Sequence, residues 1–430
     1  MTSTSVAPWL EGSRWPTVPI RLVARLGSGH TPSRSVPKYW DNCTVPWITL
    51  ADVWQLRSGT TDVIRETKEK VSELGLANSA AVKHPADTVI LSRTASVGFS
   101  AIMGADMATS QDFATWTCGP KLNPRYLLHS LRAMAPDLKR IATGSTHKTI
   151  YMPDIEQLRV PVPPMDEQHR IANFLDAETA RIDRLLTLNN SVQMRLVERV
   201  HSVRDNLVNR LADSQASAPL RRFVTRIEQG ASPQSEAVSR EGENERAVLK
   251  LSAVKNGKFH PGENKRLPED VQFSSVHEVR AGDFLVTRAN TPSLVGDVAV
   301  VGDDPPPHLL LPDLIYRVGL ISGIKAEYVM QIALSGRVRS LIESVARGTS
   351  QSMVKLRGED IKDWPIPLAT WSQQTEFVKE IAEAADDAAS IQELMKRQVR
   401  LLAERRQALI TAAVTGQIDV STASGRGIEG

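Results

Sequence analysis

The feature that most constrains this sequence is an internal repeat, because a repeat requires one fold to be built twice in the same chain. Residues 21–32 recur as residues 222–233, and five identical residues keep the single offset of 201 that separates Arg21 from Arg222. Further matches follow in the same order along both copies: Trp47–Val53 with Val248–Val254, Ile90–Arg93 with Leu285–Arg288, Gly144–Ile150 with Gly348–Val354, and Val160–Pro163 with Trp364–Pro367. We therefore expect two related units whose loops differ in length.

Each copy ends in a segment that predicts one long helix. Neither Asp166–Ala212 nor Thr370–Thr415 contains Pro or Gly, and Thr370 followed by Gln373 predicts a capping box. Gly416 is a suitable C-terminal stop. Apolar residues in both segments recur at helical spacing, which places them on one stripe. The stripe residues are Ile171, Leu175, Ile182, Leu185, Val192, Leu196, Val203 and Leu207, and then Phe377, Ile381, Ala384, Ala388, Ile391, Met395, Leu402, Leu409 and Ala413.

A narrow apolar stripe on a helix of roughly 65–70 Å needs a partner helix. Because the chain supplies two such helices, we expect them to pair with one another as an antiparallel coiled coil. The stripe residues are then expected in its core.

The segments between the helices predict mixed α and β structure. Short runs with a period near two predict strands, and amphipathic runs predict helices at 123–135 and 326–344. The expected fold class is α+β, with two similar heads separated by two long antiparallel helices that form a coiled coil with a pseudo-twofold axis. The predicted boundaries are 1–165 for the first head, 166–212 for the first helix, 213–369 for the second head, 370–416 for the second helix and 417–430 for a flexible tail.

Composition is typical of a core-forming protein, with 41% hydrophobic and 23% charged residues. Two cysteines, Cys43 and Cys118, cannot form a disulfide framework or a four-ligand zinc site, and they fit a reducing, cytoplasmic location. No long apolar run or positively charged leader predicts a membrane span or secretion. The net charge of +3 indicates no partner, although residues 1–165 carry 18 basic against 13 acidic residues.

Three motifs suggest catalysis, and the residues around each favour another interpretation. Asp166–His169 resembles a helicase acidic box, but no Gly-rich phosphate loop accompanies it and acidic residues suit a helix start. Asp304–Pro306 resembles the box of amino-methyltransferases, but the aromatic residue that should follow is replaced by Pro307. Gly27–Gly29 loses one Gly in its second copy, which favours a turn. We therefore expect a non-catalytic chain that binds no cofactor or metal itself.

Two helical motifs carry a family resemblance. Val160–Asp176 with Thr179–Asp183, and Leu402–Asp419 near the C-terminus, resemble the conserved regions of the specificity subunits of type I restriction-modification systems. The segments Asp283–Arg288 and Gly348–Gln351 look like parts of that family's target-recognition domains.

The resemblance implies a reader of a split, asymmetric DNA sequence, in which each head reads one half. It also implies that the helices dock two methyltransferase subunits, that motor-nuclease subunits join them, and that S-adenosylmethionine, ATP and Mg²⁺ belong to those partners. Two other classes remain open: a coiled-coil adapter whose heads bind proteins, and a specificity partner in a methylation-only assembly. A self-sufficient methyltransferase is disfavoured, because no cofactor loop is present.

Candidate DNA contacts recur in both heads. Arg93 and Arg288 each follow a predicted strand, and arginine is the commonest reader of guanine edges, although a surface ion pair is the alternative. Two polar loops are predicted to contact phosphates or bases, and the alternative is that they are plain turns. Two lysines are predicted to contact phosphates, and the alternative is that they belong to a solvated charged face. These residues are Ser145, Thr146, His147 and Lys148, then Thr349, Ser350 and Gln351, and finally Lys255 and Lys258.

Partner docking is assigned to the ends of the helices. Glu167 and Gln168 lie at the start of the first helix, and Glu404 and Arg406 lie near the end of the second. The second helix begins with Trp371–Gln374 where the first has Asp166–Gln168, so the sequence leaves open whether both starts dock a partner equally.

Overall fold

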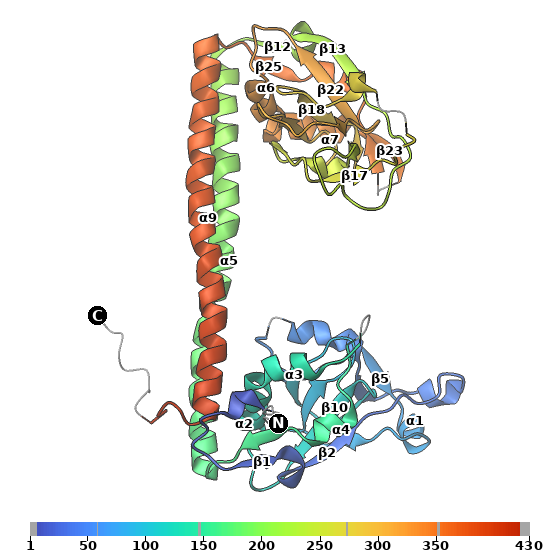
Figure 1. Cartoon of the computed structure of the whole chain (residues 1–430), viewed down its shortest axis with the longest axis vertical. Helices are drawn as coiled ribbons and strands as arrows, with labels where there is room; N and C mark the ends of the chain where they lie inside the picture. The colour runs from blue at the N-terminus through green and yellow to red at the C-terminus, as the bar shows by residue number, and fades with distance from the viewer. Residues whose placement is uncertain (1–6, 58, 145–147, 272–273, 351–352, 422–430) are drawn as a thin grey trace. The chain divides into compact units, whose positions relative to one another are not determined.

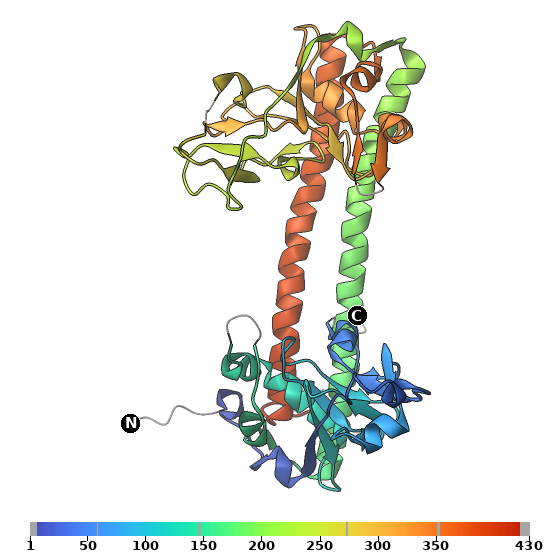
Figure 2. The same cartoon turned by 90° about the vertical axis from the view of Figure 1, so that its right-hand side faces the viewer.

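The computed structural model describes residues 7–57, 59–144, 148–271, 274–350 and 353–421. The chain divides into two units, the first comprising residues 1–191 and 395–430 and the second residues 192–394. Each unit therefore contains one head and part of both long helices, α5 (Met165–Ser214) and α9 (Trp371–Val414), which Figures 1 and 2 draw in green and red. The predicted division into heads, helices and tail remains a prediction.

The first head is built on the sheet β2-β10-β7-β8-β4, with the smaller sheet β5-β3-β9-β6 beside it. Its strands are β1 Thr17–Pro19, β2 Ala24–Ser28, β3 Val45–Ile48, β4 Val63–Ile64, β5 Glu69–Val71, β6 Lys83–His84, β7 Val89–Ser92, β8 Ser100–Met103, β9 Met107–Thr109, β10 Phe113–Cys118 and β11 Arg159–Pro161. Its helices are α1 Glu73–Ala77, α2 Pro124–Ala133, α3 Ala135–Ile141 and α4 Met152–Glu156, and the 3₁₀ helix η4 spans Leu50–Leu56.

Both faces of the main sheet of the first head are buried. Val89 and Leu91 of β7 pack with α2 and the long helices, whereas Ile90 between them packs with Val53 and Leu56 of η4. Side chains alternate across a strand, so this central strand must be apolar on both sides. The continuous apolar run Val-Ile-Leu at 89–91 follows from that requirement.

The second head repeats this plan with the sheet β13-β22-β18-β20 and the sheet β17-β14-β21. Its strands are β12 Ser217–Pro219, β13 Val224–Gln229, β14 Ala247–Leu249, β15 Val254–Lys255, β16 Lys258–Phe259, β17 Asn264–Arg266, β18 Phe284–Thr287, β19 Ala289–Asn290, β20 Val298–Val300, β21 Leu309–Leu310, β22 Ile315–Leu320, β23 Arg347–Ser350, β24 Met353–Lys355 and β25 Pro365–Pro367. Its helices are α6 Ala326–Ala333, α7 Gly336–Val345 and α8 Gly358–Lys362, and Figure 1 shows β18 beside β22. The single helix predicted at 326–344 is wrong, because the chain breaks at Ser335 between α6 and α7.

Strand pairing confirms the duplication and corrects its alignment. Arg25 pairs with Thr117 and Arg226 pairs with Gly319, so the offset of 201 holds there. A register shift between Val224 and Arg226 shows that β13 carries one extra residue at this point, which a β-bulge absorbs. Before the bulge the structural offset is 200, so the sequence matches assigned there were shifted by one residue.

The second correction concerns the strand that leads into each long helix. β1 pairs Thr17 with Pro161, and β12 pairs Ser217 with Pro367. Pro161 is therefore the counterpart of Pro367, whereas the sequence alignment matched Pro163 with Pro367. Repeated prolines two residues apart allowed both alignments, and only the strand register distinguishes them.

The two long helices pack antiparallel within the first unit. Asp183 of α5 pairs with Arg406 of α9 at 2.8 Å, and Asn189 donates from Nδ2 to the carbonyl of Met395 at 3.3 Å. As the numbering rises along one helix it falls along the other. In the second unit, Leu207 and Val208 of α5 pack with Phe377 and Ile381 of α9.

The expectation that the whole apolar stripe is core is wrong at three positions. Leu185 and Val192 on α5 are 41% and 39% exposed, and Ile391 on α9 is 40% exposed. The stripe residues nearest the heads are buried, among them Ile171, Leu175, Phe377 and Ile381. The head supplies additional apolar surface at these positions, and beyond it each helix has only its partner helix to cover the stripe.

Both long helices begin with the same buried clamp. Gln168 accepts a hydrogen bond from the backbone of Asn123 and donates to the carbonyls of Lys121 and Pro163. Gln374 accepts from the backbone of Lys325 and donates to the carbonyls of Gly323 and Ala369, with Nε2 at 3.4 Å and 2.9 Å. The two helices therefore begin with the same hydrogen bonds, although the residues before Gln168 and Gln374 differ.

The two ends of the described chain lie side by side in the first unit. The backbone of Arg14 donates to the carbonyl of Thr415 at 2.9 Å, and Gly416 ends α9 with a φ of 74°. The stop predicted at Gly416 is confirmed. Within the predicted tail, Val420 is buried in the core of the first head, and residues 422–430 lie outside the described residues.

Both heads need glycine at the equivalent positions Gly29 and Gly230, because a neighbouring backbone segment leaves no room for a side chain. A Cβ atom at Gly29 would lie 1.8 Å from the carbonyl oxygen of Thr109, and one at Gly230 would lie 2.0 Å from that of Leu311. We expect Gly230→Ala to lower the free energy of unfolding by at least about 1–3 kcal/mol, because backbone must move to admit the methyl group.

The measurement is denaturant unfolding of the full chain, with Gly242→Ala as the matched control, since no atom lies within 4 Å of a Cβ at Gly242. Equal stability of the two variants would contradict the prediction.

Candidate nucleic-acid interface

Arg93 and Arg288 stand at the same place in the two heads. Arg93 follows β7 and its backbone donates to the carbonyl of Asp112, and Arg288 follows β18 and donates to the carbonyl of Leu314, both at 2.8 Å. Since β7 and β18 are equivalent strands, the fold presents the two arginines from one duplicated position.

Neither arginine has a carboxylate within ion-pair distance among the residues that the structure describes. Both are half-buried, the Nε of Arg93 is buried without a hydrogen-bond partner there, and the guanidinium of Arg288 lies 5.9 Å from the ring centroid of Tyr316. The described residues therefore give no support to the alternative of a surface ion pair. A half-buried guanidinium without a protein partner is suited to an anionic or carbonyl ligand.

The structure brings the predicted polar loops next to these arginines. In the first head, the backbone of Ala95 donates to the carbonyl of Lys148, and Ile150 donates to the carbonyl of Arg93. Lys148 is exposed, whereas Ser145, Thr146 and His147 lie outside the described residues.

In the second head, the corresponding loop is a β-hairpin and not a plain turn. Strand β24 pairs with β19, which directly follows Arg288, and β23 carries Thr349 and Ser350 on the outer side of β24. Only the backbone of these two residues is described, and Gln351 lies outside the described residues.

Lys255 and Lys258 face one another across the hairpin of β15 and β16. Both lysines are exposed, and the turn between them, Asn256-Gly257, has φ values of 49° and 77°. Positive φ at both turn residues favours the Asn-Gly pair found here. The carboxylate of Asp297 accepts the backbone N–H of Asn256, which fixes the hairpin against the main sheet.

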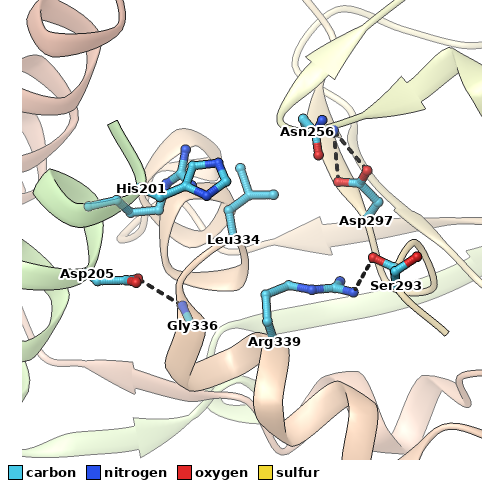
Figure 3. A pocket seen from close by; sticks show the side chains of 9 residues that line it. His201, Asp205, Asn256, Ser293, Asp297, Leu334, Gly336 and Arg339 are labelled. Atoms are coloured by element: carbon cyan, nitrogen blue, oxygen red, sulfur yellow. Dashed lines mark hydrogen bonds between the residues drawn. The ribbon is translucent and has the colours of Figure 1, made fainter. Parts of the chain in front are cut away.

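A polar cavity of about 260 Å³ lies behind this hairpin in the second head (Figure 3). Asp205 of α5 accepts the backbone N–H of Gly336 at 2.8 Å, and thereby caps α7 from another element. Arg339 donates to the carbonyls of Val295 and Ser293 at 2.8 Å and 3.1 Å.

Burial shifts the charged groups around this cavity away from their charged forms. It raises the pKa of Asp297 and lowers the pKa of Arg204 and of Arg339. The carboxylates of Asp205 and Asp297 both accept backbone N–H groups. We therefore interpret the residues around the cavity as polar contacts that fix α7 and the lysine hairpin in place.

Two of the four predicted docking residues serve the protein's own fold. Gln168 is fully buried in the helix-start clamp, and Arg406 donates to Asp183 and to the carbonyl of Gly59. Burial raises the pKa of Asp183 and lowers that of Arg406, against their mutual attraction. Both side chains are hydrogen-bonded inside the first unit, and their docking role stays a prediction.

The other two predicted docking residues lie nearer the surface. Glu167 accepts from the Nε of Arg170 at 2.9 Å and its side chain is 19% exposed. Glu404 is 65% exposed and lies 3.9 Å from Arg400. Their docking role stays a prediction.

Sequence reasoning missed a buried histidine that fastens α2 to α5. The Nε2 of His129 lies 2.6 Å from a carboxylate oxygen of Asp176, and Arg125 bonds the other oxygen of that carboxylate. Asp176 stands in the helical motif that carries the family resemblance, so the motif itself was the available signal. Burial, followed by the charges of Arg132, Arg125 and Arg406, lowers the pKa of His129 to about 3.

Within the described residues, no cluster of three or more His, Cys, Asp or Glu could hold a metal ion. None of the described helices is long and apolar enough to span a membrane.

The two heads, with their paired helices and duplicated arginines, define a two-headed α+β fold. Residues 12–194 match the family model of the type I restriction modification DNA specificity domain. The MjaIX specificity subunit of Methanocaldococcus jannaschii is 26% identical over 37% of this chain and 37% of that protein, so the match spans little more than a third of the relative. The EcoKI specificity subunit of Escherichia coli (strain K12) is 22% identical over 94% of this chain and 89% of that protein.

A chain in a solved structure of the type I R-M system has the same fold, with a TM-score of 0.68 and 16% identity over 94% of this chain and 98% of that chain. These matches confirm the resemblance and the α+β fold class that the sequence predicts. The chain is therefore similar to type I restriction-modification specificity subunits, over residues 12–194 by the family model and over most of its length by the EcoKI subunit.

The buried His129 makes stability depend on pH. Below pH 6.5 the unfolded chain binds a proton that the folded chain excludes down to about pH 3, so stability falls as the pH drops through this window. We expect a loss of about 2 kcal/mol between pH 7.5 and pH 5 from this group. Denaturant unfolding of the full chain at both pH values measures the loss.

His129→Gln is expected to reduce the difference between the two pH values, whatever its effect on absolute stability. His30→Gln, at an exposed histidine of the same head, is the control and should leave the difference unchanged. An unchanged difference in the His129 variant would contradict the prediction.

Proposed function

We propose that this chain is the DNA-reading subunit of a type I restriction-modification complex, in which each head reads one half of a split sequence. The observation that carries the proposal is the duplicated arginine. Arg93 and Arg288 leave equivalent strands without an ion-pair partner among the described residues, and each lies beside a recurrent polar segment. A bidentate guanidinium suits the O6 and N7 atoms of guanine in the major groove.

The differences between the heads support an asymmetric target. The first head carries Lys148 beside its arginine, whereas the second carries the lysine hairpin of Lys255 and Lys258 and the strand pair β23–β24. Two equivalent frames with different side chains read different half-sites.

The chemistry is assigned to partners. We propose that this chain is not an enzyme and binds no cofactor, that two methyltransferase subunits supply S-adenosylmethionine, and that motor-nuclease subunits supply ATP and Mg²⁺. This arrangement places the complex in the cytoplasm, where DNA and these subunits meet.

The apolar surface of the long helices supports the docking of methyltransferase subunits. In the first unit, Leu188 on α5 and Leu401 on α9 are 62% and 51% exposed. In the second unit, Met194 on α5 and Leu394 on α9 are 67% and 66% exposed. Apolar residues that form a contiguous exposed patch mark protein interaction sites, and we propose that these residues belong to such patches.

The test is a methylome. The chain is co-expressed with its methyltransferase subunit, and modified adenines are mapped by single-molecule sequencing. A split, asymmetric motif that changes in one half when residues 1–165 are exchanged supports the proposal. No methylation from an assembled, cofactor-loaded complex overturns it and favours the protein adapter, which would show no sequence preference in a gel shift at any salt.

Methylation without cleavage in the presence of the motor-nuclease subunits identifies the methylation-only assembly.

The two arginines are expected to act on separate half-sites. Arg93→Ala should weaken binding to the cognate duplex about 10- to 100-fold and relax the sequence preference in one half, and Arg288→Ala should do the same in the other half. Titration of duplexes mutated in either half measures both effects.

Arg400→Ala is the control, since Arg400 lies on α9 with a side chain that is 71% exposed. Loss of preference in the same half for both head variants would contradict the assignment of one head to each half-site.

Leu188→Gln is expected to reduce recovery of the methyltransferase subunit with the chain and to leave the unfolding temperature of the isolated chain unchanged, because Leu188 is exposed. Co-purification at matched expression measures the recovery. Ala180→Gln, at an exposed position on the same helix, is the control. Equal recovery in the two variants would remove Leu188 from the docking surface.

A further inference from the structure

The 3₁₀ helix η4 of the first head has one buried and one exposed face. In a 3₁₀ helix, residues three apart lie above one another. Val53 and Leu56 are 1% and 3% exposed and pack beneath the main sheet, whereas Trp54 is 65% exposed. Arg57 follows Trp54 by three residues, is also exposed, and donates its backbone N–H to the carbonyl of Trp54.

The helix that presents Trp54 is firmly held. Asp52 is fully buried and accepts the backbone N–H groups of Thr49 and Lys68 at 2.9 Å and 2.7 Å. Gln55 donates to the carbonyl of Glu66 at 3.2 Å. A large apolar side chain held out from a fixed platform gains nothing from the fold and is suited to contact with a ligand.

Three exposed basic residues and the exposed Glu66 lie on η4 and on the segment fastened to it. Besides Arg57, the segment that Asp52 and Gln55 fasten to η4 carries Arg65 and Lys68, and both are exposed. None of these three cations has an ion pair with a residue in the described part of the chain. An exposed indole among unpaired cations is complementary to the sugars, base edges and phosphates of DNA.

The duplication gives an independent second observation. Trp47 pairs with Ala108 and Val248 pairs with Leu310 in equivalent parallel strands, which fixes the offset of 201 at this point. At that offset the counterpart of Trp54 is Lys255, the exposed lysine at the start of the hairpin. Trp54 lies in the 3₁₀ helix η4 and Lys255 lies in strand β15, so the backbone differs there. Both side chains are nevertheless exposed, with an indole in one head and an ammonium group in the other.

We propose that Trp54 and Arg57 form a DNA contact of the first head, with the indole against base edges and deoxyribose in a groove and Arg57 on a phosphate. Lys255 is the counterpart in the second head and contacts phosphate alone. This inference rests on the proposed function and adds a specificity-determining residue to it. The two heads then differ at one duplicated position in the physical nature of the contact, which is apolar in the first head and ionic in the second.

The salt dependence of DNA binding distinguishes the two contacts. Each phosphate contact contributes about 0.9 to the slope of log K against log salt concentration, whereas an apolar contact contributes nothing. We expect Trp54→Ala to weaken binding to the cognate duplex about tenfold with an unchanged slope. We expect Lys255→Ala to reduce the slope by about 0.9.

The experiment titrates the motif found in the methylome with the assembled complex at several salt concentrations. Trp54→Phe should recover most of the affinity, because it retains an aromatic surface. Leu74→Ala is the control, since Leu74 is an exposed apolar residue of the same head at 47% exposure. Thermal unfolding of each variant shows that the fold is retained.

Three results overturn the inference. Affinity of Trp54→Ala equal to that of Leu74→Ala removes Trp54 from the interface. A reduced slope in Trp54→Ala shows that the indole acts through the neighbouring cations and not by apolar contact. Failure of the unmodified complex to prefer any duplex overturns the proposed function itself. This failure is distinct from the first two, because it is observed in the complex without any substitution.

Discussion

The position of each head depends on a buried glutamine at the start of a long helix. Gln168 and Gln374 use the same three hydrogen bonds to hold the loop before a head helix against the first turn of α5 or α9. Tyr126 and Tyr328 extend each clamp, since their hydroxyl groups donate to the carbonyls of Pro161 and Pro367. A buried amide with every partner in place stabilises one arrangement, because any shift leaves polar groups unpaired.

Charged side chains of the long helices also bind the heads, and they do so at different places in the two units. In the first unit, Asp176 of α5 binds His129 of the head. Arg406 of α9, which pairs with Asp183 of α5, donates to the carbonyl of Gly59 in the head. In the second unit, Asp205 caps α7 at Gly336. The helical motifs that carry the family resemblance thus include residues that hold the heads. A surface that is fixed in this way loses little conformational freedom when it binds a ligand.

Duplication followed by local change accounts for two heads with the same frame and different surfaces. The strands that carry Arg93 and Arg288 are equivalent, so the backbone frame that presents them is the same in both heads. The exposed residues around this frame differ, since Trp54 lies in the 3₁₀ helix η4 and its counterpart in the sequence, Lys255, lies in strand β15. The frame is apolar on both faces and tolerates little change, whereas the exposed loops are free to differ.

The sequence by itself determined the duplication, the two long helices, the fold class and the family resemblance, because each depends on periodicity or on matching residues along the chain. Only the tertiary structure decided the register of the repeat, since a bulge at Thr225 and the shifted prolines at 161 and 367 are defined by strand partners. It also decided that Gln168 is internal and that Trp54 is exposed. Burial depends on packing between segments distant in sequence, and a local pattern does not specify which of those segments meet.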